Sequence, residues 1–193
     1  MDKFLFFQIC LLLMYLTSKL FLLRKNIAGW VVGGVAALLS VFFYLYIPNP
    51  DTGLAILEAG TTLFYLYGFI KWHKFPGVVQ KTWFDRIFTA FAIVAGLTVI
   101  TLEFIHKVEY MHYQLIVIAG FVVGGPMIAR KKALGWIFYT VAHVAVSMWM
   151  YEKITDSLVE ETEVYYPIFS TYQALSAIIC LIAYFKYKKS PTS

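Results

Sequence analysis

The sequence predicts an all-α membrane protein with seven transmembrane helices, and three observations carry this prediction. Hydrophobic residues make up 61% of the chain and charged residues only 14%, against roughly 45–50% and 25% in soluble domains. The apolar residues form runs near or above the ~18 residues that a membrane-spanning helix needs. The basic residues gather in alternate loops, as they do in multi-pass membrane proteins.

Seven apolar runs each predict one helix, because backbone N–H and C=O groups in hydrocarbon must pair within their own segment. The connections between the runs are short and leave no room for a soluble catalytic domain. The predicted spans are 4–23, 27–47, 53–72, 84–105, 113–129, 133–151 and 165–187.

Small residues and one proline mark particular points inside these spans. Gly33 with Ala37, and Gly120 with Gly124, are spaced four apart, and such pairs let two helices pack closely. Pro126 lies within the fifth span, where it is expected to kink the helix.

The basic residues set the orientation in the membrane. One side collects twelve of the sixteen lysines and arginines, and the positive-inside rule places that side in the cytoplasm. The N-terminus is then outside and the C-terminus inside, which requires an odd number of spans. The twelve residues are Arg24, Lys25, Lys71, Lys74, Lys81, Arg86, Arg130, Lys131, Lys132, Lys186, Lys188 and Lys189.

The chain also contains an internal repeat. The stretch RKNIAGW at 24–30 recurs as RKKALGW at 130–136, an offset of 106 residues (24 to 130). A looser match sets residues 57–74 beside residues 172–189 and pairs Glu58 with Gln173 and Thr61 with Ser176. The junctions of spans one and two and of spans five and six are therefore expected to be alike.

The repeat predicts three parts. Residues 1–82 form a first three-helix bundle, 83–109 a linker helix, and 110–193 a second bundle. One linking helix makes the two triplets parallel in the membrane. Some secondary transporters use such repeats, with the substrate site between the halves.

Polar side chains inside the spans are the candidate binding residues, because they are costly in lipid. On the third and on the sixth span they recur at intervals of three and four, which places them on one helical face. The seventh span adds a polar side chain of its own. We expect them to line one cavity, and they are Glu58, Thr62, Tyr65, Trp136, Tyr139, His143 and Gln173.

Several of these residues have a purely structural alternative. Glu58 lies only about four residues from the outer end of its span, roughly 6 to 8 Å, so its carboxylate would reach the headgroups. His143 would only hydrogen-bond a neighbouring helix. Trp30, Trp72 and Trp136 lie near the cytoplasmic ends of spans, where aromatic anchors are expected.

Other function classes leave no mark on the sequence. It has no P-loop, no Cys/His metal spacing, no nucleophile elbow and no dinucleotide fingerprint. We therefore expect no enzyme activity, no catalytic residue, no metal and no cofactor. The excess of basic residues is a topology signal, so we expect the lipid bilayer and no nucleic acid as a partner.

The motifs ARKKALGW at 129–136, RKNIAGW at 24–30 and LYGFIKW at 66–72 resemble those of the PnuC family of vitamin transporters. The resemblance covers nearly the whole chain and its 3+1+3 plan, which is similar to that of sugar-transporting SWEET proteins. It implies uptake of a small vitamin, most often nicotinamide riboside, across the cell inner membrane by facilitated diffusion. It also implies trapping by a cytoplasmic kinase and a homotrimeric assembly.

By the same resemblance, the family's W-x-x-W in the sixth helix corresponds to Trp136 and Tyr139, and a polar position of its third helix to Glu58. The family commonly has an acidic residue where Leu134 stands and an aspartate where His143 stands. Three alternatives stay open: thiamine or another vitamin as substrate, coupling to protons through Glu58 or His143, and a subunit of a membrane complex.

Overall fold

The computed structural model describes residues 3–46, 52–75, 82–106, 111–156 and 165–189, and every regular element within these ranges is helical. The prediction of an all-α protein is therefore confirmed. The chain divides into two compact units, Met1–Pro76 and Gly77–Ser193, called the first and the second unit below.

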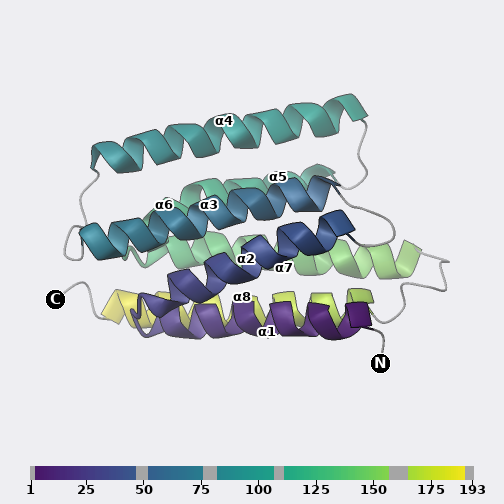
Figure 1. Cartoon of the computed structure of the whole chain (residues 1–193), viewed down its shortest axis with the longest axis horizontal. Coiled ribbons are helices and arrows are strands. Elements are labelled where there is room, and N and C mark those ends of the chain that lie inside the picture. The colour runs from purple at the N-terminus through teal and green to yellow at the C-terminus, as the bar shows by residue number, and fades with distance from the viewer. Residues whose placement is uncertain (1–2, 47–51, 76–81, 107–110, 157–164, 190–193) are drawn as a thin grey trace. The chain divides into compact units, whose positions relative to one another are not determined.

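The first unit contains three helices, and the middle one packs along both of the others (Figure 1). Their bounds lie within two residues of the predicted spans, because the apolar runs that require internal backbone pairing are the helices themselves. The three are α1 (Lys3–Leu23), α2 (Ala28–Tyr46) and α3 (Thr52–Lys74).

The second unit contains the remaining helices. Three consecutive segments, α5, η1 and α6, together occupy the predicted fifth span, and α7 packs against all three of them and against α8. The helix α4 contacts α5 and η1. The bounds are α4 (Trp83–His106), α5 (Met111–Ala119), η1 (Gly120–Gly124), α6 (Gly125–Ala129), α7 (Leu134–Asp156) and α8 (Tyr165–Lys189).

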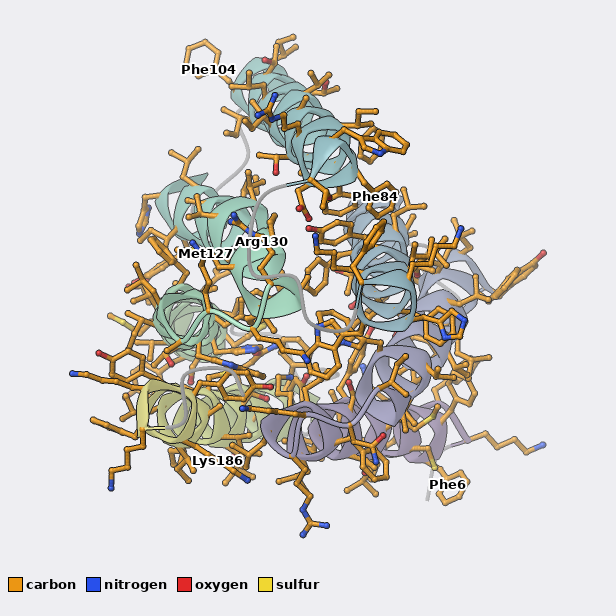
Figure 2. The ribbon with its side chains drawn as sticks, turned by 90° about the vertical axis from the view of Figure 1, so that its left-hand side faces the viewer. Phe6, Phe84, Phe104, Met127, Arg130 and Lys186 are labelled. Carbon is orange, nitrogen blue, oxygen red and sulfur yellow. The ribbon has the colours of Figure 1, made fainter. Side chains whose placement is uncertain are left out.

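The surfaces of these helices fit a lipid environment. Among the described residues, α1, α2, α7 and α8 are long and apolar enough to cross a membrane, and Leu115–Ala129 is a shorter apolar helix. Large apolar side chains point away from their own helices, as Phe6 (54% exposed) and Phe104 (72% exposed) do in Figure 2. Such exposure is unfavourable in water and ordinary in hydrocarbon, so the fold is that of a multi-pass membrane protein.

The irregularity of the fifth span lies before Pro126 and not at it. The five residues Gly120–Gly124 form a π-helix, and Pro126 stands in the first turn of α6. A proline ring clashes with the carbonyl four residues earlier, here that of Val122, which lies inside the π-helical stretch. The expected disturbance is therefore present as a widened helical turn.

The corner between α1 and α2 has an unusual backbone. Lys25 has φ 56°, a left-handed conformation that glycine usually supplies at the end of a helix. The Lys25 N–H donates to the Leu22 carbonyl (2.9 Å) and the Asn26 N–H to the Phe21 carbonyl (2.9 Å). These two bonds are those of a Schellman motif.

The corner between α6 and α7 repeats this geometry. Lys131 has φ 57°, its N–H donates to the Ile128 carbonyl (2.8 Å), and the Lys132 N–H donates to the Met127 carbonyl (2.8 Å). The two lysines are equivalent in the RKNIAGW and RKKALGW stretches. The predicted likeness of these two junctions is thus confirmed at the level of the backbone.

The glycine of each stretch has the same role. A Cβ on Gly29 would lie 2.7 Å from the Ser18 carbonyl oxygen and 2.8 Å from the Leu22 nitrogen. A Cβ on Gly135 would lie 2.7 Å from the Gly124 carbonyl oxygen and from the Ile128 nitrogen. Both glycines therefore let the second helix of the corner touch the backbone of the first, which no larger residue allows.

Candidate functional site

The centre of the candidate site in the second unit is a buried hydrogen bond between α7 and α8. His143 Nδ1 and Gln173 Oε1 are 2.5 Å apart, and both side chains are only 6% exposed. Because an amide oxygen only accepts hydrogen bonds, the imidazole carries its proton on Nδ1 in this arrangement. The pair places a ring N–H donor and an amide oxygen acceptor inside the bundle.

Aromatic rings adjoin this pair on α7. The Tyr139 ring meets the His143 ring edge-on at 6.1 Å and the Phe121 ring of η1 at 5.1 Å. Trp136 lies one turn before Tyr139 on α7 and packs edge-on against Tyr187 of α8 at 5.6 Å. The four candidate residues predicted on spans six and seven are thus buried together along one α7–α8 face.

Glycines bring the π-helical stretch close to this face. A Cβ on Gly124 would lie 2.9 Å from Tyr139 Cδ2, and one on Gly120 would lie 2.6 Å from the Ala142 Cβ. The small pair predicted to allow close helix packing does so here. Sequence reasoning did not predict Phe121 as the neighbour of Tyr139, since an apolar side chain in an apolar run carries no signal.

In the first unit, Glu58 is held by a residue that the sequence analysis did not single out. The Tyr15 hydroxyl donates to Glu58 Oε2 (2.5 Å) and lies 3.4 Å from Ser40 Oγ. Lys19 is buried, lies 5.9 Å from the centre of the Tyr15 ring and acts electrostatically on Glu58. The spacing of four between Tyr15 and Lys19 on α1 is the signal that would have suggested this cluster.

Thr62 and Tyr65 lie on the same helix as Glu58. The Thr62 hydroxyl donates to the backbone carbonyl of Glu58 (2.9 Å), so it is engaged within α3. The Tyr65 ring lies directly on Gly33, where an added Cβ would be 2.1 Å from the ring, and it packs edge-on against Trp30 at 5.9 Å.

The tryptophans at the helix corners are not lipid-facing anchors. Trp30 is 1% exposed and packs edge-on against Trp72 at 5.5 Å, and Trp136 is equally buried. The expectation of aromatic anchors at these positions was wrong: the rings are buried inside their own units, and Trp30 packs on Gly68, where an added Cβ would lie 2.2 Å from its ring.

The seven candidate residues therefore form two groups, one in each unit: Glu58, Thr62 and Tyr65 in the first, and Trp136, Tyr139, His143 and Gln173 in the second. Over the described part of the chain, no group of three or more His, Cys, Asp or Glu side chains is placed to hold a metal ion. The second group combines aromatic surface with hydrogen-bonding side chains.

The family comparison decides what kind of protein carries this arrangement. The sequence model of the family described as "Nicotinamide mononucleotide transporter" matches residues 5–189. The chain belongs to this family, the PnuC family. No curated protein and no solved structure matches it. The resemblance predicted from the corner motifs is confirmed, and the protein is a membrane protein of a transporter family.

Proposed function

We propose that the protein carries nicotinamide riboside into the cell by facilitated diffusion and that a cytoplasmic kinase then traps it by phosphorylation. The observation that supports this most is the α7–α8 face, where the buried His143–Gln173 pair adjoins Tyr139 and the buried Trp136 lies two turns from His143 on α7. A nucleoside needs a flat surface for its ring and neutral partners for its hydroxyl and amide groups, and this face has both.

The charge of the site favours the riboside over the mononucleotide. The cationic nicotinamide ring gains ~0.5 to 2 kcal/mol from each contact with an aromatic face. A phosphate would need an arginine, a lysine or several N–H donors to replace its water. The described side chains of the α7–α8 face, Trp136, Tyr139, His143, Gln173 and Ser176, include no lysine or arginine.

The proposed architecture is two parallel three-helix bundles, residues 1–82 and 110–193, joined by the linker helix 83–109. The like backbone of the Lys25 and Lys131 corners supports this SWEET-like 3+1+3 plan. The basic residues support an N-terminus outside and a C-terminus in the cytoplasm. We also propose, from the family resemblance, that the protein forms a homotrimer in the cell inner membrane.

A proton-coupled carrier is the second candidate function. The observation that favours it is the partly buried Tyr15–Glu58 hydrogen bond with the buried Lys19 beside it, since carboxyl groups inside membrane proteins often relay protons. Uptake into vesicles with an imposed proton gradient separates the two: coupling predicts accumulation above the outside concentration that an uncoupler abolishes, and facilitated diffusion predicts equilibration that an uncoupler does not change.

Uptake in cells that hold the matching kinase tests the leading proposal. Trp136→Ala is expected to lower uptake at least tenfold per folded molecule. Trp30→Ala is the matched control, because Trp30 is equally buried at the equivalent corner and its loss leaves a cavity of the same size. If both variants transport equally well per folded molecule, Trp136 is a packing residue and the proposed stacking site is wrong.

A panel of vitamins tests the substrate. The melting temperature of the purified protein is expected to rise with nicotinamide riboside. A larger rise with thiamine or riboflavin would assign another vitamin to the same site.

A further inference from the structure

The α7–α8 face contains a buried serine hydroxyl, that of Ser176, which makes no hydrogen bond to any described residue. Ser176 is fully buried (0% exposed), and its Oγ has no hydrogen-bond partner among the described residues. A buried polar group without a partner is costly in a protein interior and more so in hydrocarbon. Such a hydroxyl calls for a partner from outside the chain.

Other hydroxyl groups in these helices bond to their own backbone. Thr140 donates to the Trp136 carbonyl (2.8 Å), and Thr171 donates to the Pro167 carbonyl (2.8 Å), each four residues earlier. This is the usual way for a helical serine or threonine to satisfy its hydroxyl. Ser176 makes no such bond among the described residues, so its hydroxyl is left without this usual backbone partner.

The position of Ser176 places this hydroxyl beside the candidate site. It stands three residues after Gln173 on α8, so the two side chains share one helical face, and Gln173 is the partner of His143. Trp136, on α7, supplies a second unsatisfied group: its indole Nε1 is buried and has no partner among the described residues. An acceptor-donor hydroxyl one turn from Gln173 on α8 and an N–H donor two turns from His143 on α7 therefore lie on the same side of the His143–Gln173 pair, toward the Trp136–Tyr187 contact.

Comparison of the two repeats shows whether the three-helix arrangement itself needs a buried hydroxyl at the position of Ser176. The equivalent residue in the first unit is Thr61, which is partly exposed, whereas the corner residues Trp30 and Trp136 are alike in both units. A fully buried, unbonded hydroxyl is thus not a requirement of the three-helix arrangement.

We propose that Ser176 hydrogen-bonds directly to a neutral hydroxyl or carboxamide group of the transported molecule. This inference rests on the proposed function and adds a contact residue on α8 to it. The hydroxyl of Ser176 both donates and accepts, so it suits a ribose hydroxyl as well as an amide. Its neighbours Gln173 and His143 would hold the adjacent polar group of the same molecule.

Two readouts on purified protein test the proposal: the dissociation constant for nicotinamide riboside and the thermal unfolding midpoint without ligand. Ser176→Ala is expected to weaken binding about 3- to 10-fold, the size of one lost hydrogen bond. Its unfolding midpoint is expected to be equal to or higher than that of the parent, because the unsatisfied hydroxyl is gone. Thr171→Ala is the control, since that hydroxyl is exposed and bonded within α8, and it is expected to leave binding unchanged.

The outcomes are separable. Unchanged binding by Ser176→Ala, with a parent protein that binds, overturns the assignment of Ser176 and leaves the proposed function standing. A lower unfolding midpoint for Ser176→Ala also overturns it, because the hydroxyl would then have a structural partner. A parent protein that binds neither nicotinamide riboside nor thiamine overturns the proposed function, and the Ser176 contact with it.

Nicotinamide without its ribose is a further probe. Loss of affinity for both molecules in Ser176→Ala assigns the contact to the carboxamide, and loss for the riboside alone assigns it to the ribose.

Discussion

The glycine corners lead to a quantitative prediction about stability. Gly135→Ala would place a methyl group 2.7 Å from the Gly124 carbonyl oxygen, 2.7 Å from the Ile128 nitrogen and 2.8 Å from the Met127 Cβ. Carbon atoms in ordinary contact are about 3.5–4.0 Å apart. Two of the three atoms belong to the backbone and cannot rotate away, so α6 and α7 must separate at their corner.

The size of the effect follows from two opposing terms. Overpacking of this kind costs about 1–3 kcal/mol, and replacing glycine by alanine in a helix regains up to roughly 1 kcal/mol. Because three short contacts arise together, we expect a net loss near 2 kcal/mol. For a chain of this length that is a decrease in melting temperature of roughly 4–8 °C.

Thermal unfolding of the purified protein in detergent measures this decrease. Gly60→Ala is the matched control, because no atom lies within 4 Å of a Cβ added at Gly60, and it is expected to be neutral or stabilising. Gly29→Ala is expected to lower the melting temperature as Gly135→Ala does, since its corner has the same contacts. If Gly135→Ala is as stable as Gly60→Ala, the close corner described for α6 and α7 is wrong.

Three further predictions concern single contacts. Lys131→Gly is expected to raise the free energy of unfolding by about 1 kcal/mol, because glycine adopts the left-handed conformation at no steric cost; a decrease in a detergent unfolding assay would contradict this. Tyr15→Phe is expected to lower it by about 1 kcal/mol through the lost bond to Glu58, and an unchanged midpoint would argue against that bond. Glu58→Gln, which can still accept from Tyr15, is expected to leave the rate of uptake unchanged, whereas the proton-coupled alternative predicts that accumulation is lost without the Glu58 carboxyl.

The helices themselves were predictable from hydropathy alone. The run expected at 4–23 is the helix Lys3–Leu23, and the run expected at 165–187 is Tyr165–Lys189. Agreement is close because in lipid every backbone group must pair within its own segment, so a long apolar run has no other regular structure open to it.

Tertiary contacts were only partly predictable. Helical spacing placed Trp136, Tyr139 and His143 on one face, and the structure buries all three together. The partner of Glu58 was missed, because Tyr15 lies on another helix 43 residues away; the spacing of four between Tyr15 and Lys19 marks a polar face of α1 but does not say which helix it meets.

Two backbone features left no trace in residue type. The π-helix at Gly120–Gly124 lies in a run that is apolar on all sides, so no change of periodicity marks it. The left-handed conformation of Lys25 and Lys131 is usually adopted by glycine at the end of a helix, so a lysine at these positions gives no sign of it. Only the repeat of the two motifs indicated that these positions are alike.

The most direct test of the account is transport by the purified protein in liposomes, with labelled nicotinamide riboside outside and neither ATP nor an ion gradient present. Facilitated diffusion through the aromatic and neutral polar face of α7 and α8 predicts saturable uptake that stops when inside and outside concentrations are equal, and that weakens in Ser176→Ala. Absence of uptake, or accumulation only when a proton gradient is imposed, would contradict it.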